Sequence, residues 1–328
     1  MPHGQKPLQV AVAVIKNADG QILISLRDQA LHQGGFWEFP GGKIESGETP
    51  VQALARELKE ELDITVTRST PLINIVHQYP DKQVQLHVFL VEDFSGIAKS
   101  CEGQPLKWVT AEDLTHFSFP AANQAIITAA SLPPYYAILD DANEALLLEN
   151  LQKILDRGIK LIQARLKRLS AETVKVFMAQ AGSLCKQQGA LLFINSAVKL
   201  TDEGHVFNDL DSGLWETRLI DIDGIHLTSS HLMARNQRPE NISWLSASCH
   251  NLEELQHAQQ VGVDFVVLAP VLATQTHPDV LPLGWREFES LVSKAQIPVY
   301  ALGGMNEACL MVAREAGGQG ISAIRAFL

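Results

Sequence analysis

The spacing of apolar residues changes about 130 residues into the chain. In the first part, short apolar runs are mixed with a helical stretch, Pro50–Leu62, where apolar residues recur every three or four positions at Val51, Leu54, Leu58 and Leu62. A proline suits the first turn of such a helix. The mixture of strands and helices predicts an α+β sandwich. We expect strands at Val10–Ile15, Ile22–Arg27, Leu72–His77, Gln83–Glu92 and Leu106–Val109, a glycine-rich loop after the second strand, and a last helix at Ala121–Ala130.

After Pro133–Pro134 the pattern alternates strictly between buried runs and segments of helical period. Eight buried strands that alternate with helices predict a (β/α)8 or TIM barrel. The proline pair cannot continue a preceding helix, so we place the boundary there, with domains at 1–131 and 132–328. The eight runs are Tyr135–Leu139, Leu161–Arg165, Leu191–Asn195, Gly224–Thr228, Leu245–Cys249, Phe265–Pro270, Val299–Gly303 and Ile321–Ile324, and helices are expected at Glu144–Arg157, Ala171–Gln188 and Asn251–Val261.

Composition narrows the class of protein. The 328 residues carry a net charge of −11, with −5 in the first 131 residues and −6 in the rest, so neither part is a basic module that binds nucleic acid directly. The four cysteines are widely spaced and form no C-x-x-C pair, which favours a reducing compartment. The apolar run Leu8–Ile15 is too short to cross a membrane. We therefore expect a soluble cytoplasmic protein without a membrane partner.

Three carboxylates gather on one face of the first helix. Glu57, Glu60 and Glu61 are three and four residues apart, so they lie together on the helix surface. Such carboxylates repel one another, and a hard divalent cation such as Mg²⁺ offsets that repulsion and bridges to substrate phosphates. A solvated acidic face remains the alternative on these residues alone.

The surroundings of these glutamates match a known motif. Gly42, Glu48, Arg56-Glu57-Leu58, Glu60-Glu61 and Ile64 fit the box G-x5-E-x7-R-E-U-x-E-E-x-G-U, where U is aliphatic, and the chain therefore resembles the Nudix hydrolase family. Asp63 stands where the family has glycine. We expect Asp63 to end the helix in a left-handed conformation, at a cost of about 1 kcal/mol or less.

The resemblance extends over most of residues 8–130 and is to the 8-oxo-dGTP diphosphatases of that family. It rests on Trp37–Gly42, Glu102–Pro105 with Trp108, and Phe119–Asn123. It implies Mg²⁺ as the metal, with Mn²⁺ as a substitute, and a nucleotide as the substrate. The implied metal ligands are Gly41 through its carbonyl, Glu57, Glu60, Glu61 and Glu102; Arg56 would hold the glutamates, Glu57 or Glu102 would act as the base, and the nucleotide would contact Arg27, His32, Glu38, Phe39, Pro40 and Asn123.

Asn123 has a chemical reason to read an oxidised base. Guanine N7 is an acceptor, whereas 8-oxoguanine carries a hydrogen there, and an amide can accept from that N7–H while it donates to O6. Taken alone, an asparagine before an apolar helix is more often an N-cap. His32, Arg27 and Glu102 taken alone would be a loop histidine, a surface cation and a solvated charge, so their implied roles depend on the resemblance.

Polar residues follow the strands of the second part, where barrel enzymes carry their active sites. Paired glycines and hydroxyls after the late strands suit a phosphate cradle, and Arg165 with Lys167 can reach an anion from the rim. A plain turn at Gly303-Gly304 and a surface cation at Arg165 remain alternatives. The candidate ligand-binding residues are Gln163, Arg165, Lys167, Asn195, His250, Thr274, Thr276, Gly304 and Ser322.

Together these segments resemble the thiamine-phosphate synthase family over roughly residues 133–328. The likeness includes Asp223–Leu227 and departs where that family binds Mg²⁺: Ser196 and His231 stand at or near the positions of its two aspartates, and His277 replaces a lysine. Without those carboxylates the means of activating a pyrophosphate leaving group is lost, so synthase activity is not expected. A thiazole tautomerase of the same family uses no metal, and His250 lies near the position of its histidine.

The leading hypothesis is therefore Mg²⁺-dependent hydrolysis of 8-oxo-dGTP to monophosphate and pyrophosphate, which prevents mutagenic incorporation and serves DNA repair and replication. A second hypothesis is hydrolysis of a thiamine-related pyrophosphate, suggested by the attached barrel. The barrel itself is expected to bind a thiamine-pathway phosphate ligand without catalysis or to support assembly as a docking module, and tautomerase activity is the alternative.

Overall fold

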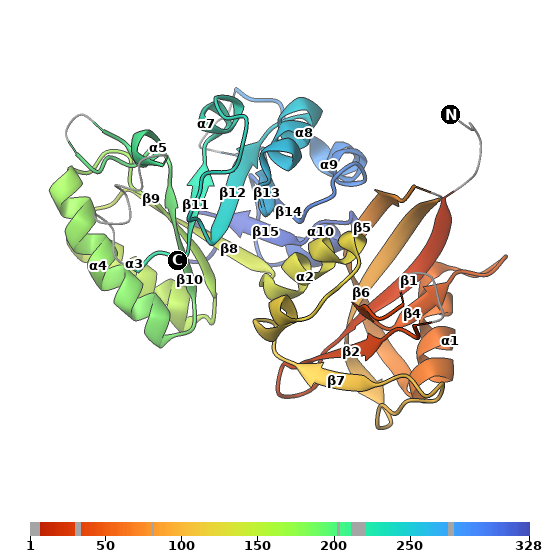
Figure 1. Cartoon of the computed structure of the whole chain (residues 1–328). Coiled ribbons are helices and arrows are strands. Elements are labelled where there is room, and N and C mark those ends of the chain that lie inside the picture. Colours follow the sequence, from red (N-terminus) through yellow and green to blue (C-terminus); the bar gives the residue numbers. More distant parts are fainter. Residues whose placement is uncertain (1–6, 30–33, 81, 202–203, 211–220, 275–278) are drawn as a thin grey trace. The chain divides into compact units, whose positions relative to one another are not determined.

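The structure is a computed structural model that describes residues 7–29, 34–80, 82–201, 204–210, 221–274 and 279–328. The chain forms two compact units, Met1–Ser131 and Leu132–Leu328 (Figure 1). Each unit has its own sheets and its own hydrophobic clusters.

The described residues of the first unit, which is drawn red to yellow in Figure 1, form two sheets and two α-helices. In the larger sheet the order is β4-β1-β6-β5, with β1 parallel to β6 and the other pairs antiparallel. The smaller sheet has the order β3-β2-β7. The elements are β1 (Leu8–Ile15), β2 (Ile22–Leu26), β3 (Trp37–Glu38), β4 (Gly41–Lys43), α1 (Pro50–Leu62), β5 (Thr65–Gln78), β6 (Gln83–Ser95), β7 (Leu106–Val109), the 3-10 turns η1 (Asp113–His116) and η2 (Ala121–Asn123), and α2 (Gln124–Ser131).

The two faces of β1 serve two hydrophobic clusters. Because side chains alternate along a strand, Ala11 and Ala13 pack with α1, whereas Val12 and Val14 pack in the cluster that contains α2. The sheet is thus covered by a helix on each face, and the predicted α+β sandwich is confirmed.

Helix α1 has the bounds that the apolar spacing predicts. Its start is fixed by a capping box in which the Thr49 hydroxyl accepts from the Gln52 N–H, while the Gln52 side chain accepts from the Thr49 N–H. Leu54, Leu58 and Leu62 are fully buried. The helix ends at Asp63 with φ 55° and ψ 30°, which confirms the left-handed conformation expected there.

The expected glycine-rich loop is wrong in part, because it contains the short strands β3 and β4. Strand β4 lies beside β1, and a Cβ added at Gly41 would stand 2.1 Å from the Ala11 carbonyl oxygen. Only glycine permits that approach, and Gly41 also has φ +142°. The last helix also differs, since the chain forms the turn η2 through Asn123 before α2 begins.

The second unit is a closed barrel of eight parallel strands, as predicted, with the order β8-β9-β10-β11-β12-β13-β14-β15 around the ring. Every strand end lies within two residues of its expected position. The elements are β8 (Tyr135–Asp140), α3 (Glu144–Asp156), β9 (Leu161–Arg165), α4 (Ala171–Gln187), β10 (Leu191–Asn195), α5 (Val206–Asp209), β11 (Gly224–Leu227), α7 (Ser229–Met233), β12 (Trp244–Cys249), α8 (Leu252–Val261), β13 (Phe265–Leu268), α9 (Gly284–Val292), β14 (Val299–Leu302), α10 (Cys309–Glu315) and β15 (Gly320–Ala323).

Two packing layers hold the barrel together. Aromatic rings of Tyr136, Phe193, Phe265 and Tyr300 pack edge to face or at a tilt in one fully buried cluster. Aliphatic residues form the larger cluster between strands and helices. In the parts of the chain that the structure describes, no helix has the length and apolar character needed to cross a membrane.

Candidate functional site

A cavity of about 790 Å³ opens in the first unit, and it is lined by carboxylates as well as by aromatic and amide side chains. Glu57, Glu61 and Glu102 lie on its lining, as do Phe39 and Asn123. The structure therefore brings expected metal ligands and expected nucleotide contacts to one space. Glu60 is not on this lining, and its side chain is 57% exposed.

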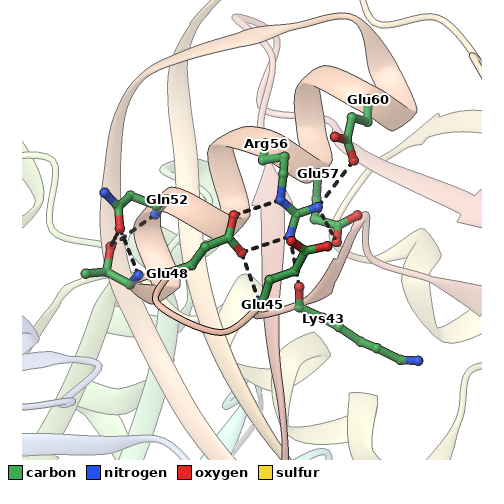
Figure 2. Close-up of polar contacts among 8 residues, drawn as sticks. Lys43, Glu45, Glu48, Gln52, Arg56, Glu57 and Glu60 are labelled. Carbon is green, nitrogen blue, oxygen red and sulfur yellow. Dashed lines mark hydrogen bonds and ion pairs between the residues drawn. The ribbon is translucent and has the colours of Figure 1, made fainter.

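Arg56 is the centre of an ion-pair network around α1 (Figure 2). Its guanidinium pairs with Glu48 through two atoms at 2.8 and 2.9 Å, and its third nitrogen reaches Glu57 at 2.9 Å and Glu60 at 3.2 Å. It also donates to the Lys43 carbonyl at 3.0 Å. Hydrogen bonds from Arg56 lower the pKa of the Glu48 carboxyl to about 2.

Glu48 was given no role in the site from the sequence, although it occupies a fixed glutamate position of the box. Its two carboxylate oxygens hold Arg56 in a bidentate pair, which fixes a guanidinium plane more firmly than one contact does. Arg56 is thereby aimed at Glu57 and Glu60. The sequence indicates Glu48 only by its position in the motif. Its pairing with Arg56 depends on how the loop before α1 folds back onto the helix.

Glu61 is a partly buried carboxylate of this cavity. Burial and, to a smaller extent, the charges of Glu57 and Glu102 raise the pKa of its carboxyl to about 8, although a 3.2 Å hydrogen bond from the Gly41 N–H lowers it. The backbone of the glycine pair also packs closely on Glu57, since a Cβ at Gly42 would stand 2.2 Å from the Glu57 carboxyl carbon. Both glycines therefore place main chain against the carboxylates.

These residues suit a divalent cation by their donor chemistry. Glu57, Glu61 and Glu102 offer carboxylate oxygens to the same cavity, and the adjoining glycine backbone carries no side chain that would fill the space. Among the described residues, no group of three or more His, Cys, Asp and Glu side chains is already drawn together as a metal-binding cluster. Nudix proteins in general need a divalent metal ion.

The expected base-reading residues Phe39 and Asn123 line the same cavity. Phe39 is buried and stacks on Phe119 with ring centroids 5.4 Å apart. Asn123 is 9% exposed, and its side-chain amide makes no hydrogen bond to any other residue in the described ranges. It does not cap α2 by a side-chain hydrogen bond, so the N-cap alternative has no contact to support it.

Of the other expected nucleotide contacts among the described residues, two line this cavity and one does not. Arg27 and Glu38 both line the cavity and pair with each other at 2.6 Å, and burial raises the pKa of Glu38 despite that pairing. Pro40 lies off the lining, and its carbonyl accepts from the Ala13 N–H at 2.8 Å. His32 is outside the described residues.

Tyr79 lines the cavity but was not singled out from the sequence. Its hydroxyl accepts a hydrogen bond from the Ala122 N–H, next to Asn123 in the chain, and burial raises its pKa. The signal for this residue was weak, because a tyrosine after an expected strand has no feature that marks it as part of a site.

The barrel has a smaller cavity of about 250 Å³ at the carboxyl ends of β14 and β15. Thr274, Gly304 and Ser322 line it together, whereas Thr276 is outside the described residues. Gly303 and Gly304 have φ values of +99° and +69°, and a Cβ at Gly304 would stand 2.7 Å from the Leu272 Cβ. This paired turn leaves room for an anion against main chain.

Gln163 and Asn195 are instead part of a buried polar network inside the barrel. Asn195 donates to Gln163 at 2.9 Å, and Gln163 donates to the Tyr136 hydroxyl at 3.1 Å. That hydroxyl lies 3.3 Å from His226 Nδ1, and His226 also contacts Ser246 and Ser248, both at 2.8 Å. Burial lowers the pKa of His226 to about 3, so the network is neutral.

The remaining expected barrel residues already have partners. Arg165 pairs with Asp140 through two contacts of 3.1 and 2.7 Å. Burial and the Arg165 charge lower the pKa of half-buried Lys167. His250 Nδ1 lies 2.9 Å from Glu254, whose other oxygen accepts from the Ser229 hydroxyl at 2.8 Å.

Ser196 and His231, which stand at or near the positions of the two missing aspartates, form a hydrogen bond with each other. Ser196 Oγ lies 2.8 Å from His231 Nδ1 and accepts from the Thr228 N–H at 3.0 Å, and the His231 ring stacks on Phe207. Ser196 is fully buried. A hydroxyl and an imidazole bound to one another do not suit Mg²⁺, so the residues of this barrel do not fit the metal that its fold family implies.

The folds and sites define the class of protein. Its first unit carries an acidic cavity of the kind that suits hydrolysis of phosphate esters, and its second unit is a (β/α)8 barrel. The first unit matches the NUDIX domain family over residues 11–129, and the second matches the thiamine monophosphate synthase family over residues 135–327. The chain belongs to both families, one in each unit, and its first unit is a Nudix hydrolase.

Three relatives illustrate the match. The 8-oxo-dGTP diphosphatase of Escherichia coli K12 is 41% identical over 122 residues, which are 37% of this chain and 95% of that protein. The putative thiamine-phosphate synthase 2 of Aquifex aeolicus is 31% identical over 201 residues, 60% of this chain and 98% of that protein. The CTP pyrophosphohydrolase of Escherichia coli K12 is 35% identical over 124 residues, 38% and 91% of the two chains.

Proposed function

We propose that the first unit hydrolyses 8-oxo-dGTP to the monophosphate and pyrophosphate. The observation that carries this proposal is the buried side-chain amide of Asn123, which has no hydrogen-bond partner among the described residues and lines the same cavity as Glu57, Glu61 and Glu102. A carbonyl oxygen that accepts from N7–H and an NH₂ that donates to O6 complement the oxidised base, whereas ordinary guanine would set that oxygen against a lone pair. The relatives named 8-oxo-dGTP diphosphatase support the same substrate.

The acidic residues would hold Mg²⁺, for which Mn²⁺ can substitute. Its ligands would be Glu57, Glu60, Glu61, Glu102 and the Gly41 carbonyl. When bound, the ion neutralises phosphate charge and lowers the pKa of water. Arg56 keeps Glu57 and Glu60 in place through the contacts of 2.9 and 3.2 Å.

Hydrolysis cleaves the P–O–P bridge between the α and β phosphates. The water oxygen bonds to one phosphorus while the bond from that phosphorus to the bridging oxygen breaks. The proton of that water passes to a carboxylate, for which Glu57 is our first choice and Glu102 the competitor, and the bridging oxygen stays with the phosphate group that the water does not attack. Arg27 would contact phosphate or sugar, and Phe39 would pack beside the base. Removal of 8-oxo-dGTP keeps it out of newly made DNA, without direct contact to nucleic acid.

A rate comparison in Mg²⁺ with 8-oxo-dGTP, dGTP, CTP and thiamine pyrophosphate tests the substrate. We expect the highest kcat/KM for 8-oxo-dGTP. Equal rates with dGTP would remove the basis of the repair function. The membership of the second unit in the thiamine monophosphate synthase family favours a thiamine-type pyrophosphate as the second candidate, and the highest kcat/KM for thiamine pyrophosphate would select it.

We propose that the barrel binds a phosphorylated ligand of the thiamine pathway without a metal. Its support is the cavity at Gly304 and Ser322 together with the bonded pair Ser196–His231. Isothermal titration of the full chain with thiazole phosphate in EDTA tests this, and we expect saturable binding that Gly304→Ala weakens.

Tautomerase activity is the second candidate for the barrel. The contact between His250 and Glu254 favours it, because a carboxylate on Nδ1 leaves Nε2 as a base. Turnover of a thiazole phosphate that is lost in His250→Asn would select this function over simple binding. We also place the domain boundary between residues 131 and 132 and the protein in the cytoplasm, where its four free thiols would stay reduced.

A further inference from the structure

The loop between β6 and β7, residues 96–105, carries Glu102 to the cavity. Glu102 is exposed, and its neighbours Cys101 and Gly103 are exposed too, so packing does not fix its position. The loop is held instead by hydrogen bonds to the carboxyl end of α1. The Lys99 N–H donates to the Leu62 carbonyl at 3.1 Å, and the Cys101 N–H donates to the Glu61 carbonyl at 3.0 Å.

One side chain completes this attachment. The Gln104 Nε2 donates to the Glu61 carbonyl at 3.2 Å, while its Oε1 accepts from the Glu102 N–H at 3.1 Å and from the Ser100 hydroxyl at 2.8 Å. The amide of Gln104 therefore bridges the backbones of Glu61 and Glu102. Because a planar amide fixes its donor and acceptor relative to each other, this bridge sets the spacing between the two chain segments that present these carboxylates.

Asp63, the position where the box departs from glycine, lies at the same junction. Its carboxylate pairs with Lys59 of α1 and, at 2.8 Å, with Lys99 of the loop. A glycine here would allow the left-handed backbone more readily but would carry no charge to join helix and loop. The departure thus adds a link that the family residue does not offer.

We infer that Gln104 and Asp63 are positioning residues that hold Glu102 beside Glu57 and Glu61, so that the metal site is assembled by an amide bridge and a charged bridge. The inference rests on the proposed role of Glu102 as a metal ligand. Gln104 acts through the backbone of Glu102, and Asp63 acts through Lys99. Neither side chain needs to touch the substrate.

Mn²⁺ binding to the full chain without nucleotide, followed by electron paramagnetic resonance, tests the inference. Gln104→Ala removes all three of these hydrogen bonds and is expected to weaken Mn²⁺ binding about three- to tenfold. Asp63→Gly and Asp63→Asn are expected to weaken it about twofold to fivefold, less so in high salt, because the ion pairs are exposed. In turnover assays, kcat falls while KM for the nucleotide stays unchanged.

Asp63→Gly separates positioning from stability, since glycine suits the left-handed backbone and keeps the Tm near that of the unchanged protein. Gln152→Ala and Glu149→Gln on α3 are the matched controls, because Gln152 bonds Asp156 and Glu149 pairs with Lys153 away from any site. They should leave Mn²⁺ binding unchanged.

Weakened binding in Glu102→Gln together with unchanged binding in Gln104→Ala and Asp63→Gly would overturn the inference and leave the proposed function standing. Unchanged binding in Glu102→Gln would instead remove Glu102 from the metal site, and the inference would fall with that assignment. Weakened binding in all three, with unchanged controls, supports it.

Discussion

The two units handle buried polarity in opposite ways. In the first unit, Glu57, Glu61 and Glu102 face one cavity, and burial and mutual repulsion raise the pKa of Glu61 to about 8. In the barrel, polar residues that end or follow the strands pair with one another: Arg165 pairs with Asp140, and Ser196 with His231. Unbalanced carboxylates require a cation from outside, whereas a neutral, internally bonded network does not. The difference supports our proposal that the first unit performs the metal-assisted chemistry.

The largest expected effect comes from removing one carboxylate of the first unit. Glu57→Gln keeps the size of the side chain but abolishes its basicity, so kcat with 8-oxo-dGTP should fall by about 10²- to 10⁴-fold. Steady-state kinetics at saturating Mg²⁺ measures this, with Glu92→Gln on the exposed side of β6 as the control. A folded Glu57→Gln protein with near-normal turnover would reject the assignment.

Asn123→Ala separates base recognition from metal-dependent turnover in the first unit. Loss of the paired contacts to N7–H and O6 should reduce the preference for 8-oxo-dGTP over dGTP by about ten- to a hundredfold, with kcat for dGTP unchanged. Competition kinetics with both nucleotides measures the preference. Asn143→Ala, which removes the N-cap of α3, should lower the Tm and leave the preference intact; a preserved preference in Asn123→Ala would mean that another residue reads the base.

The neutral network of the barrel predicts a sensitivity to acid. Because the folded pKa of His226 is about 3 and its unfolded value is about 6.5, the unfolded chain binds the proton first as pH falls. Stability is therefore full above pH 6.5 and falls by about 1.4 kcal/mol per pH unit below it, or about 2 kcal/mol by pH 5. Denaturant titrations across this range should show the loss, and His226→Asn should flatten it. An equally steep fall in His226→Asn would assign the proton to another group.

The smallest effect concerns the barrel cavity. Gly304→Ala adds a Cβ 2.7 Å from the Leu272 Cβ at a backbone φ of +69°, so binding of inorganic phosphate in EDTA should weaken about tenfold. Gly158→Ala is the matched control, since Gly158 also has a positive φ but its added Cβ would meet nothing within 4 Å. Equal phosphate binding by both variants would place the anion elsewhere.

Much of the fold follows from local pattern. The apolar spacing that ends at Leu62 predicts α1. Asp63 can take the left-handed conformation that ends the helix because aspartate tolerates it better than most residues. The eight barrel strands are short buried runs, so each is visible without its neighbours. Strands β3 and β4 were missed because they consist of two and three residues, and β4 depends on the glycine that lets it approach Ala11.

The sites are harder to predict, because their contacts join distant residues. The box indicates the glutamates of α1. It does not indicate that Glu48 in the preceding loop binds Arg56, or that Gln104 bonds Glu61, 43 residues earlier, and thereby links it to Glu102. The absence of carboxylates at Ser196 and His231 could be recognised from resemblance. Their bond to each other depends on β10 and β11 being neighbours in the ring.

The central claim is that metal binding resides in the first unit alone. A Mn²⁺ titration of the full chain carrying Glu57→Gln and Glu61→Gln tests it directly. We expect the double variant to stay folded and to lose all submillimolar Mn²⁺ binding. A submillimolar site that persists in this variant would place a metal in the barrel and contradict the account.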